Sequence, residues 1–239
     1  MGIWQKIKQF HRSRKKYIVT IVLLFIVIVM AIYAGDVGAK RGKLDYSKSL
    51  DLVAARVNGT ELSLRSLAFY VAYEEAQVQE QALVYNPEDT SKYWNLHVDG
   101  IYIRVAARNA AIQMGIHDEL FYEMAVADGI ELNREEEEAL ASAQEDFCAD
   151  LWEDGRTERL GVSEEDICAS MRKAALAEKY QSIYAQLTDK AFEDYSYGQG
   201  AYEELLEQQD YEICKNVWSK IDMGNITLDH ESAYNNKNQ

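Results

Sequence analysis

The chain has 239 residues, of which 40 are acidic and 25 basic, so its formal net charge at pH 7 is −15. The stretch up to Lys43 holds nine basic residues and one acid, a net +8, which leaves −23 for the rest of the chain. A region this acidic does not neutralise phosphates, which excludes nucleic acid as its partner. The 13 Gly and single Pro argue against a loop-rich all-β fold and favour long helices.

An apolar run covers residues 17–34 and contains no charge, Gly or Pro. As a helix rising 1.5 Å per residue, it spans most of a ~30 Å hydrocarbon core. Residues 1–16 are basic and contain no acid, so the positive-inside rule places them in the cytoplasm and the rest of the chain outside. We therefore predict a single transmembrane helix at 17–34. Its anchor residues are Tyr17, Leu24, Phe25 and Tyr33.

The alternative is a cleaved secretory signal, with Val37-Gly38-Ala39 as the cleavage site. The apolar run is longer than the core of an ordinary signal peptide, which favours an uncleaved anchor. In either case the downstream chain is exported, and the expected location is the outer face of a cytoplasmic membrane.

The exported part divides into a polar juxtamembrane linker at 35–51, one domain at 52–230, and a disordered tail at 231–239. Near the start of the domain, Asn58-Gly59 separates two short apolar runs and predicts a β-hairpin. Ser63 is then expected to cap a helix whose apolar positions include Val71 and Val78. The fold class is thus mainly α with a small hairpin.

A further helix is expected to open at Asn86-Pro87. The spacing of apolar residues then predicts one long amphipathic helix from Trp94 to Gly129, with Gly100 and Gly115 as two points where it can break.

Asn133 and Glu136 form a capping-box pattern for the next helix, whose predicted buried face is Leu140, Ala143, Phe147 and Leu151. Gly161-Val162-Ser163 is a second signal of this kind: the glycine ends one helix and Ser163 caps the next, which ends near Leu187. A last helix is predicted over residues 202–223. A short strand at 226–228 could complete a small sheet with the hairpin.

The sequence shows no catalytic constellation, no metal site and no cofactor motif. The four histidines lack a ligand-spaced partner, and the chain has no HExxH, GxSxG, Walker or GxGxxG pattern. Glu135 to Glu138 follow a cap and form an ordinary acidic first turn. Cys148, Cys168 and Cys214 are predicted to be buried free thiols, with a Cys148–Cys168 disulfide as the alternative.

Three segments carry a resemblance to a known family: VNGTELS, MAVADGIELNREEEEAL and LGVSEEDICASMRKAALAEKYQSIYAQL. In this order they resemble the N-terminal domain of SurA and PrsA, the helical chaperone part of exported bacterial peptidyl-prolyl isomerases. The resemblance covers roughly residues 52–187. It departs from the family because only 52 residues follow Leu187, too few for a parvulin domain, and His230 lacks the second histidine of a parvulin site.

The resemblance implies a membrane-anchored, extracytoplasmic chaperone-like protein that binds unfolded or exported polypeptides and has no isomerase activity. Its client would enter an apolar cleft between helices. Eight aromatic and Met side chains are the candidates for lining this cleft, although such residues at helical spacing also form cores: Trp94, Tyr102, Met114, Phe121, Met124, Trp152, Tyr180 and Tyr184.

Two other functions stay open at this point. One is a bitopic structural or assembly partner in a cell-envelope complex, docking one folded protein. The other is an unusual peptidyl-prolyl isomerase. The sequence identifies neither the client nor the oligomeric state.

Overall fold

The computed structural model describes residues 42–153, 155–228 and 230. The chain divides into two units, Met1–Lys43 and Leu44–Gln239, and the elements below belong to the second. The predicted cytoplasmic tail, the anchor at 17–34, residues 35–41 of the linker and the tail at 231–239 lie outside the described residues. Within the described part of the chain, no helix has both the length and the apolar character needed to cross a membrane.

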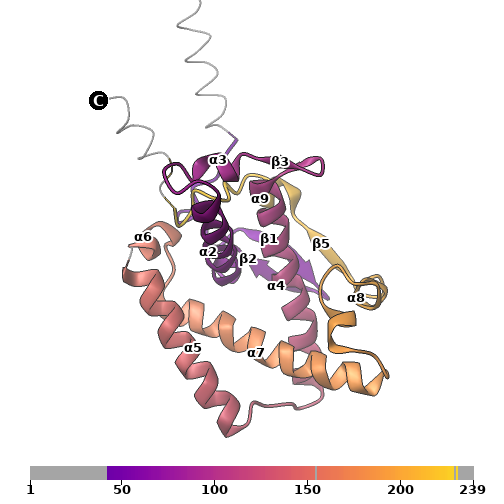
Figure 1. Cartoon of the computed structure of the whole chain (residues 1–239). Helices are drawn as coiled ribbons and strands as arrows, with labels where there is room; N and C mark the ends of the chain where they lie inside the picture. The colour runs from indigo at the N-terminus through magenta and orange to yellow at the C-terminus, as the bar shows by residue number, and fades with distance from the viewer. Residues whose placement is uncertain (1–41, 154, 229, 231–239) are drawn as a thin grey trace, which may run out of the picture. The chain divides into compact units, whose positions relative to one another are not determined.

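The second unit is mainly α, as predicted (Figure 1). Its four long helices are α2 (Ala68–Tyr85), α4 (Ile103–Ala127), α5 (Arg134–Glu153) and α7 (Glu164–Leu187). Shorter ones are α3 (Ser91–Trp94), α6 (Arg156–Leu160), α8 (Gly200–Leu206), α9 (Lys215–Trp218) and the 3₁₀ helix η1 (Phe192–Tyr195). α4 packs along α7 and against α2, and α5 lies on α7.

The predicted hairpin is confirmed: β1 (Val53–Val57) pairs antiparallel with β2 (Thr60–Ser63). Asn58 and Gly59 both have positive φ, 48° and 90°, as a type I′ turn requires. The third strand is β5 (Tyr211–Ile213), which pairs with the other edge of β1 and gives the order β2-β1-β5.

The predicted helix over 202–223 is therefore wrong. The chain leaves α8 after Leu206, and the free edge of β1 draws it into extended form: Asn58 N donates to Asp210 O at 2.7 Å and Cys214 N to Ala54 O at 2.8 Å. These tertiary hydrogen bonds outweigh a modest helix propensity.

The predicted strand at 226–228 is also wrong, because its backbone donors go to one side chain. Glu75, fully buried in α2, accepts from Gly224 N at 2.5 Å, Ile226 N at 3.1 Å and Thr227 N at 2.6 Å. It also accepts from Thr227 Oγ1 at 2.6 Å. Burial raises the pKa of Glu75, and these four hydrogen bonds oppose that rise. We call this arrangement the Glu75 clasp; it fixes the C-terminal segment on α2.

The predicted helix from Trp94 to Gly129 breaks at Gly100 and continues through Gly115. Asp99 and Gly100, with φ of 51° and 86°, join β3 (His97–Val98) to β4 (Ile101–Tyr102) in a hairpin before α4 begins. Gly115 lies within α4, and Leu67 packs on it so closely that a Cβ there would lie 2.3 Å from Leu67 Cδ2.

Two predicted helix starts are confirmed at their caps, whereas the helix expected to open at Asn86-Pro87 begins only at Ser91, as α3. Asn133 and Glu136 exchange capping hydrogen bonds, and Ser163 forms a capping box, with Asp166 as its partner. Ser63 differs: its hydroxyl accepts from Ser66 N at 3.3 Å in a turn, and α2 begins only at Ala68.

One of the predicted buried positions is exposed in the structure. Ala143 of α5 faces solvent, while Cys148 is buried beside the predicted Leu140 and Leu151.

Candidate functional site

α2 buries one side in the core and leaves apolar side chains exposed on the other. Val71, Val78 and Ala82 belong to the buried side. Tyr73 and Leu83, which fall outside that stripe, are 40% and 48% exposed. Exposed apolar side chains that cluster beside hollows in a surface are typical of binding sites.

The first hollow lies between α2 and α5 and has a volume of about 360 Å³. Tyr73 and Leu83 of α2 and Phe147 of α5 provide its large apolar side chains. Glu80 and Asp150 add a carboxylate from each helix, and Arg156 of α6 adds a positive charge. We call it the α2–α5 groove.

The second hollow, of about 320 Å³, is the Tyr197 groove. Phe69 and Tyr73 from α2, Met114 from α4 and Tyr197 from the loop after η1 line it. Tyr73 lines both grooves, and the Phe69 ring lies 5.3 Å from the ring of Phe147, so the two grooves adjoin. Burial raises the pKa of Tyr197, with Glu74 and Tyr73 adding to the shift, so this phenol stays neutral at pH 7.

Together these hollows define what we call the α2 surface: Phe69, Tyr73, Leu83, Phe147 and Tyr197.

The polar wall of the Tyr197 groove is already paired. His117 Nδ1 lies 2.8 Å from Asp118 Oδ1, and His117 Nε2 lies 3.0 Å from Tyr195 O. Tyr70 donates to the other oxygen of Asp118 at 3.0 Å. Because both ring nitrogens of His117 are engaged, the ring is not available as a general base or a metal ligand.

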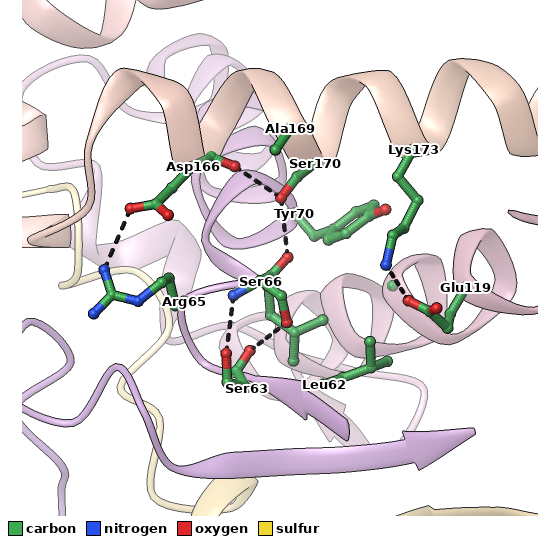
Figure 2. A pocket seen from close by; sticks show the side chains of 12 residues that line it. Leu62, Ser63, Arg65, Ser66, Tyr70, Glu119, Asp166, Ala169, Ser170 and Lys173 are labelled. Atoms are coloured by element: carbon green, nitrogen blue, oxygen red, sulfur yellow. Dashed lines mark hydrogen bonds and ion pairs between the residues drawn. The ribbon is translucent and has the colours of Figure 1, made fainter. Parts of the chain in front are cut away.

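The third hollow is a cavity of about 200 Å³ between β2, the start of α2, α4 and α7 (Figure 2). Leu62, Leu67 and Gly115 line its apolar part. Lys173 of α7 reaches across to the carboxylate of Glu119 on α4, which is 2% exposed, and so closes an ion pair beside the cavity. Pockets that bind drug-sized ligands usually have volumes of about 300–1,000 Å³. This cavity is smaller, and its volume suits a single side chain.

The hydroxyls of this cavity donate to backbone carbonyls. Ser66 Oγ donates to Ser63 O at 2.9 Å, and Ser170 Oγ lies 3.2 Å from Ser66 O and 3.1 Å from Asp166 O. Ser63, the third serine of the cavity, accepts from Ser66 N through its hydroxyl at 3.3 Å.

The cysteines are free thiols, as predicted, but Cys148 alone of the three is buried; Cys168 and Cys214 are half-buried. Burial raises the pKa of the Cys148 thiol to about 12, and the neighbouring Cys168 and Glu164 add to the rise. At neutral pH Cys148 is therefore protonated and a poor nucleophile.

The structure distributes the eight predicted client-binding side chains over core and surface. Trp94 and Phe121 are fully buried, and Tyr180 is 4% exposed with its hydroxyl donating to Asp128. Tyr184, Met114 and Met124 are half-buried, and Tyr102 and Trp152 are exposed. Of the eight, Met114 alone lines one of the three hollows described above.

No residue of the α2 surface was among the predicted client-binding candidates: Phe147 was predicted only to be buried, and Phe69, Tyr73, Leu83 and Tyr197 were not singled out. A signal for two of them was present in the sequence. Tyr73 and Leu83 break the apolar stripe of α2, and an apolar residue off the stripe of an amphipathic helix marks a surface patch. Phe69 and Tyr197 gave no such signal, because their grouping depends on how η1 and its loop return to α2.

The chain matches no protein-family model, and neither the curated proteins nor the solved structures contain a significant match to it.

Proposed function

We propose that this chain is a membrane-anchored, chaperone-like protein that binds unfolded or exported polypeptides on the outer side of a cytoplasmic membrane, without isomerase activity. The observation that carries the proposal is the α2 surface, where exposed aromatic and aliphatic side chains border two adjoining grooves.

The dimensions of the grooves suit short apolar segments of a chain. Their volumes of about 360 and 320 Å³ each accommodate a few side chains. Because Tyr73 lines both, a bound segment could run from one groove into the other. An extended or helical polypeptide with apolar side chains at intervals has this form.

Charge supports a client with basic residues. The chain after Lys43 carries a net −23, and the α2–α5 groove has two carboxylates, Glu80 and Asp150, against one guanidinium, Arg156. An acidic field raises the encounter rate with basic segments, an effect that salt weakens.

The apolar run at 17–34 and its basic flank support the membrane part of the proposal. A tether increases the local concentration of the binding domain near emerging chains without adding any contact. The resemblance to the helical chaperone part of SurA and PrsA agrees with both features.

The test uses the full-length chain in lipid nanodiscs, with empty nanodiscs as the blank. We expect near-stoichiometric suppression of the aggregation of a reduced, unfolded client, stronger at low salt, and no acceleration of a proline-limited refolding reaction. Accelerated refolding would identify an isomerase. Absence of suppression would overturn the proposal and favour a dedicated partner in an envelope complex.

A pair of matched variants locates the activity. Tyr73→Ser removes the ring shared by both grooves, and we expect suppression to fall several-fold. Tyr211→Ser removes a tyrosine of nearly equal exposure, 41%, from β5, which lines neither groove, and it should leave suppression unchanged. Equal losses in both variants would mean that the α2 surface is not the binding site.

A further inference from the structure

Three side chains with metal-binding atoms converge where α5 and α7 pack together. Cys148 comes from α5, and Glu164 and Cys168 lie one turn apart at the start of α7. The two sulfur atoms and a carboxylate oxygen all lie within 4.8 Å of one another. Residues four apart share a face of a helix, so α7 presents two ligand side chains to the one from α5.

The three donors form a ligand set that Zn²⁺ accepts. Two thiolates and a carboxylate fill three positions of a tetrahedral site, with Zn–S near 2.3 Å and Zn–O near 2.0–2.2 Å. Tetrahedral bonds of this length place two sulfurs about 3.8 Å apart. The present separations therefore need to shrink by at most about 1 Å, which side-chain rotation can supply.

Burial is graded across the cluster in a way that leaves one side open. Cys148 is 5% exposed, Cys168 is half-buried and Glu164 is exposed. A water molecule can therefore provide the fourth ligand from the Glu164 side. Gln144, one turn before Cys148, donates to the backbone oxygen of Cys168 at 2.9 Å and fixes the two helices at this point.

We propose that Cys148, Cys168 and Glu164 bind a soft divalent cation of the Zn²⁺ type, which fastens α5 to α7. The carboxylates in the first turn of α7 would not by themselves indicate a metal site. The indication comes from the two thiols, which approach each other from different helices. Among the described side chains of α5, few are buried, namely Leu140, Cys148 and Leu151. A metal bridge would thus add to the Glu137–Arg172 and Glu136–Lys179 ion pairs that join α5, one wall of the α2–α5 groove, to α7.

The experiment uses the full-length chain in detergent, reduced with a phosphine and freed of metal with a chelator. Co²⁺ is the probe because its absorption reports the ligands. We expect a 1:1 complex with a near-ultraviolet sulfur-to-cobalt charge-transfer band, displaced by Zn²⁺. Cys148→Ser and Cys168→Ser should each weaken the band, and Glu164→Gln should lower the affinity about tenfold or more while keeping the band.

Cys214→Ser is the matched control, because Cys214 is a half-buried thiol outside the cluster, and it should bind as the unmodified chain does. Equal Co²⁺ spectra for the unmodified chain and Cys168→Ser would overturn the proposal. A second result would also overturn the proposal. In it, the reduced chain binds no metal, and an added disulfide oxidant takes two hydrogens from Cys148 and Cys168 and links them as a disulfide. If Cys148→Ser unfolds, the half-buried Cys168 carries the test, with the rise in melting temperature on Zn²⁺ addition as a second readout.

Discussion

The two sides of α2 use neighbouring residues for opposite purposes. Glu75 is fully buried, and all its hydrogen bonds to the segment 224–227 are short-range and directional. Tyr73, two positions earlier, is 40% exposed, and its ring lies 6.0 Å from the ring of Phe69. One side of the helix thus specifies a unique fold, whereas the other side offers apolar area that does not depend on a particular partner.

This difference predicts how each side responds to mutation. Buried polar groups become costly when they lose one partner, because the remaining donors stay desolvated. Removing an exposed aromatic ring changes the free energy of unfolding little, because water takes its place. Changes to the buried side should therefore alter the free energy of unfolding, and changes to the exposed side should alter binding.

The largest effect is expected for Glu75→Gln. The amide places NH₂ where one carboxylate oxygen accepts, so two of the four donors face a donor instead. We expect a loss of about 3 kcal/mol in the free energy of unfolding, measured by urea denaturation of the full-length chain. Glu74→Gln is the matched control at the preceding position, with an expected change within about 0.5 kcal/mol.

The second effect concerns the packing of α2 on α4. Gly115→Ala would place a Cβ 2.3 Å from Leu67 Cδ2, and we expect a destabilisation of about 2 kcal/mol. Leu67→Ala should cost less in the Gly115→Ala background than alone, because the smaller side chain makes room for the new methyl. Additive losses in this double-mutant cycle would contradict the proposed clash.

The sequence was most informative where structure is local. The Asn58-Gly59 turn and the caps at Asn133 and Ser163 depend on residues within a few positions, and all three predictions are confirmed. The hairpin at Asp99-Gly100 is local too, but the apolar spacing of the flanking residues concealed it.

The rest depended on contacts between distant segments. Residues 211–213 form a strand because the edge of β1 is free, and residues 226–228 do not form one because Glu75 takes their donors. Neither contact leaves a periodic pattern in the sequence. For the same reason the α2 surface, which joins α2, α5 and the loop after η1, was not foreseen, and Met114 is the one predicted client-binding residue that lines either groove.

A third, smaller effect isolates one hydrogen bond of the Glu75 clasp. Thr227→Val keeps the shape of the side chain and removes its hydroxyl donor, which lies 2.6 Å from Glu75. We expect a loss of about 1 kcal/mol, read from the urea midpoint. In the Glu75→Gln background this loss should shrink. A loss of equal size in both backgrounds would mean that the hydroxyl acts independently of Glu75.

The smallest effect on stability is expected on the exposed side. Tyr73→Ser and Leu83→Ser should each change the free energy of unfolding by no more than about 0.5 kcal/mol, because both side chains are already two-fifths exposed or more. The same variants should reduce client binding, as measured by suppression of aggregation. The two sides of α2 would then control stability and binding separately. Glu75→Gln, assayed at a temperature below its unfolding midpoint, should keep the client binding that Tyr73→Ser loses. If Tyr73→Ser instead destabilised the chain by several kcal/mol, Tyr73 would belong to the core, and the exposed side of α2 would have no binding role distinct from folding.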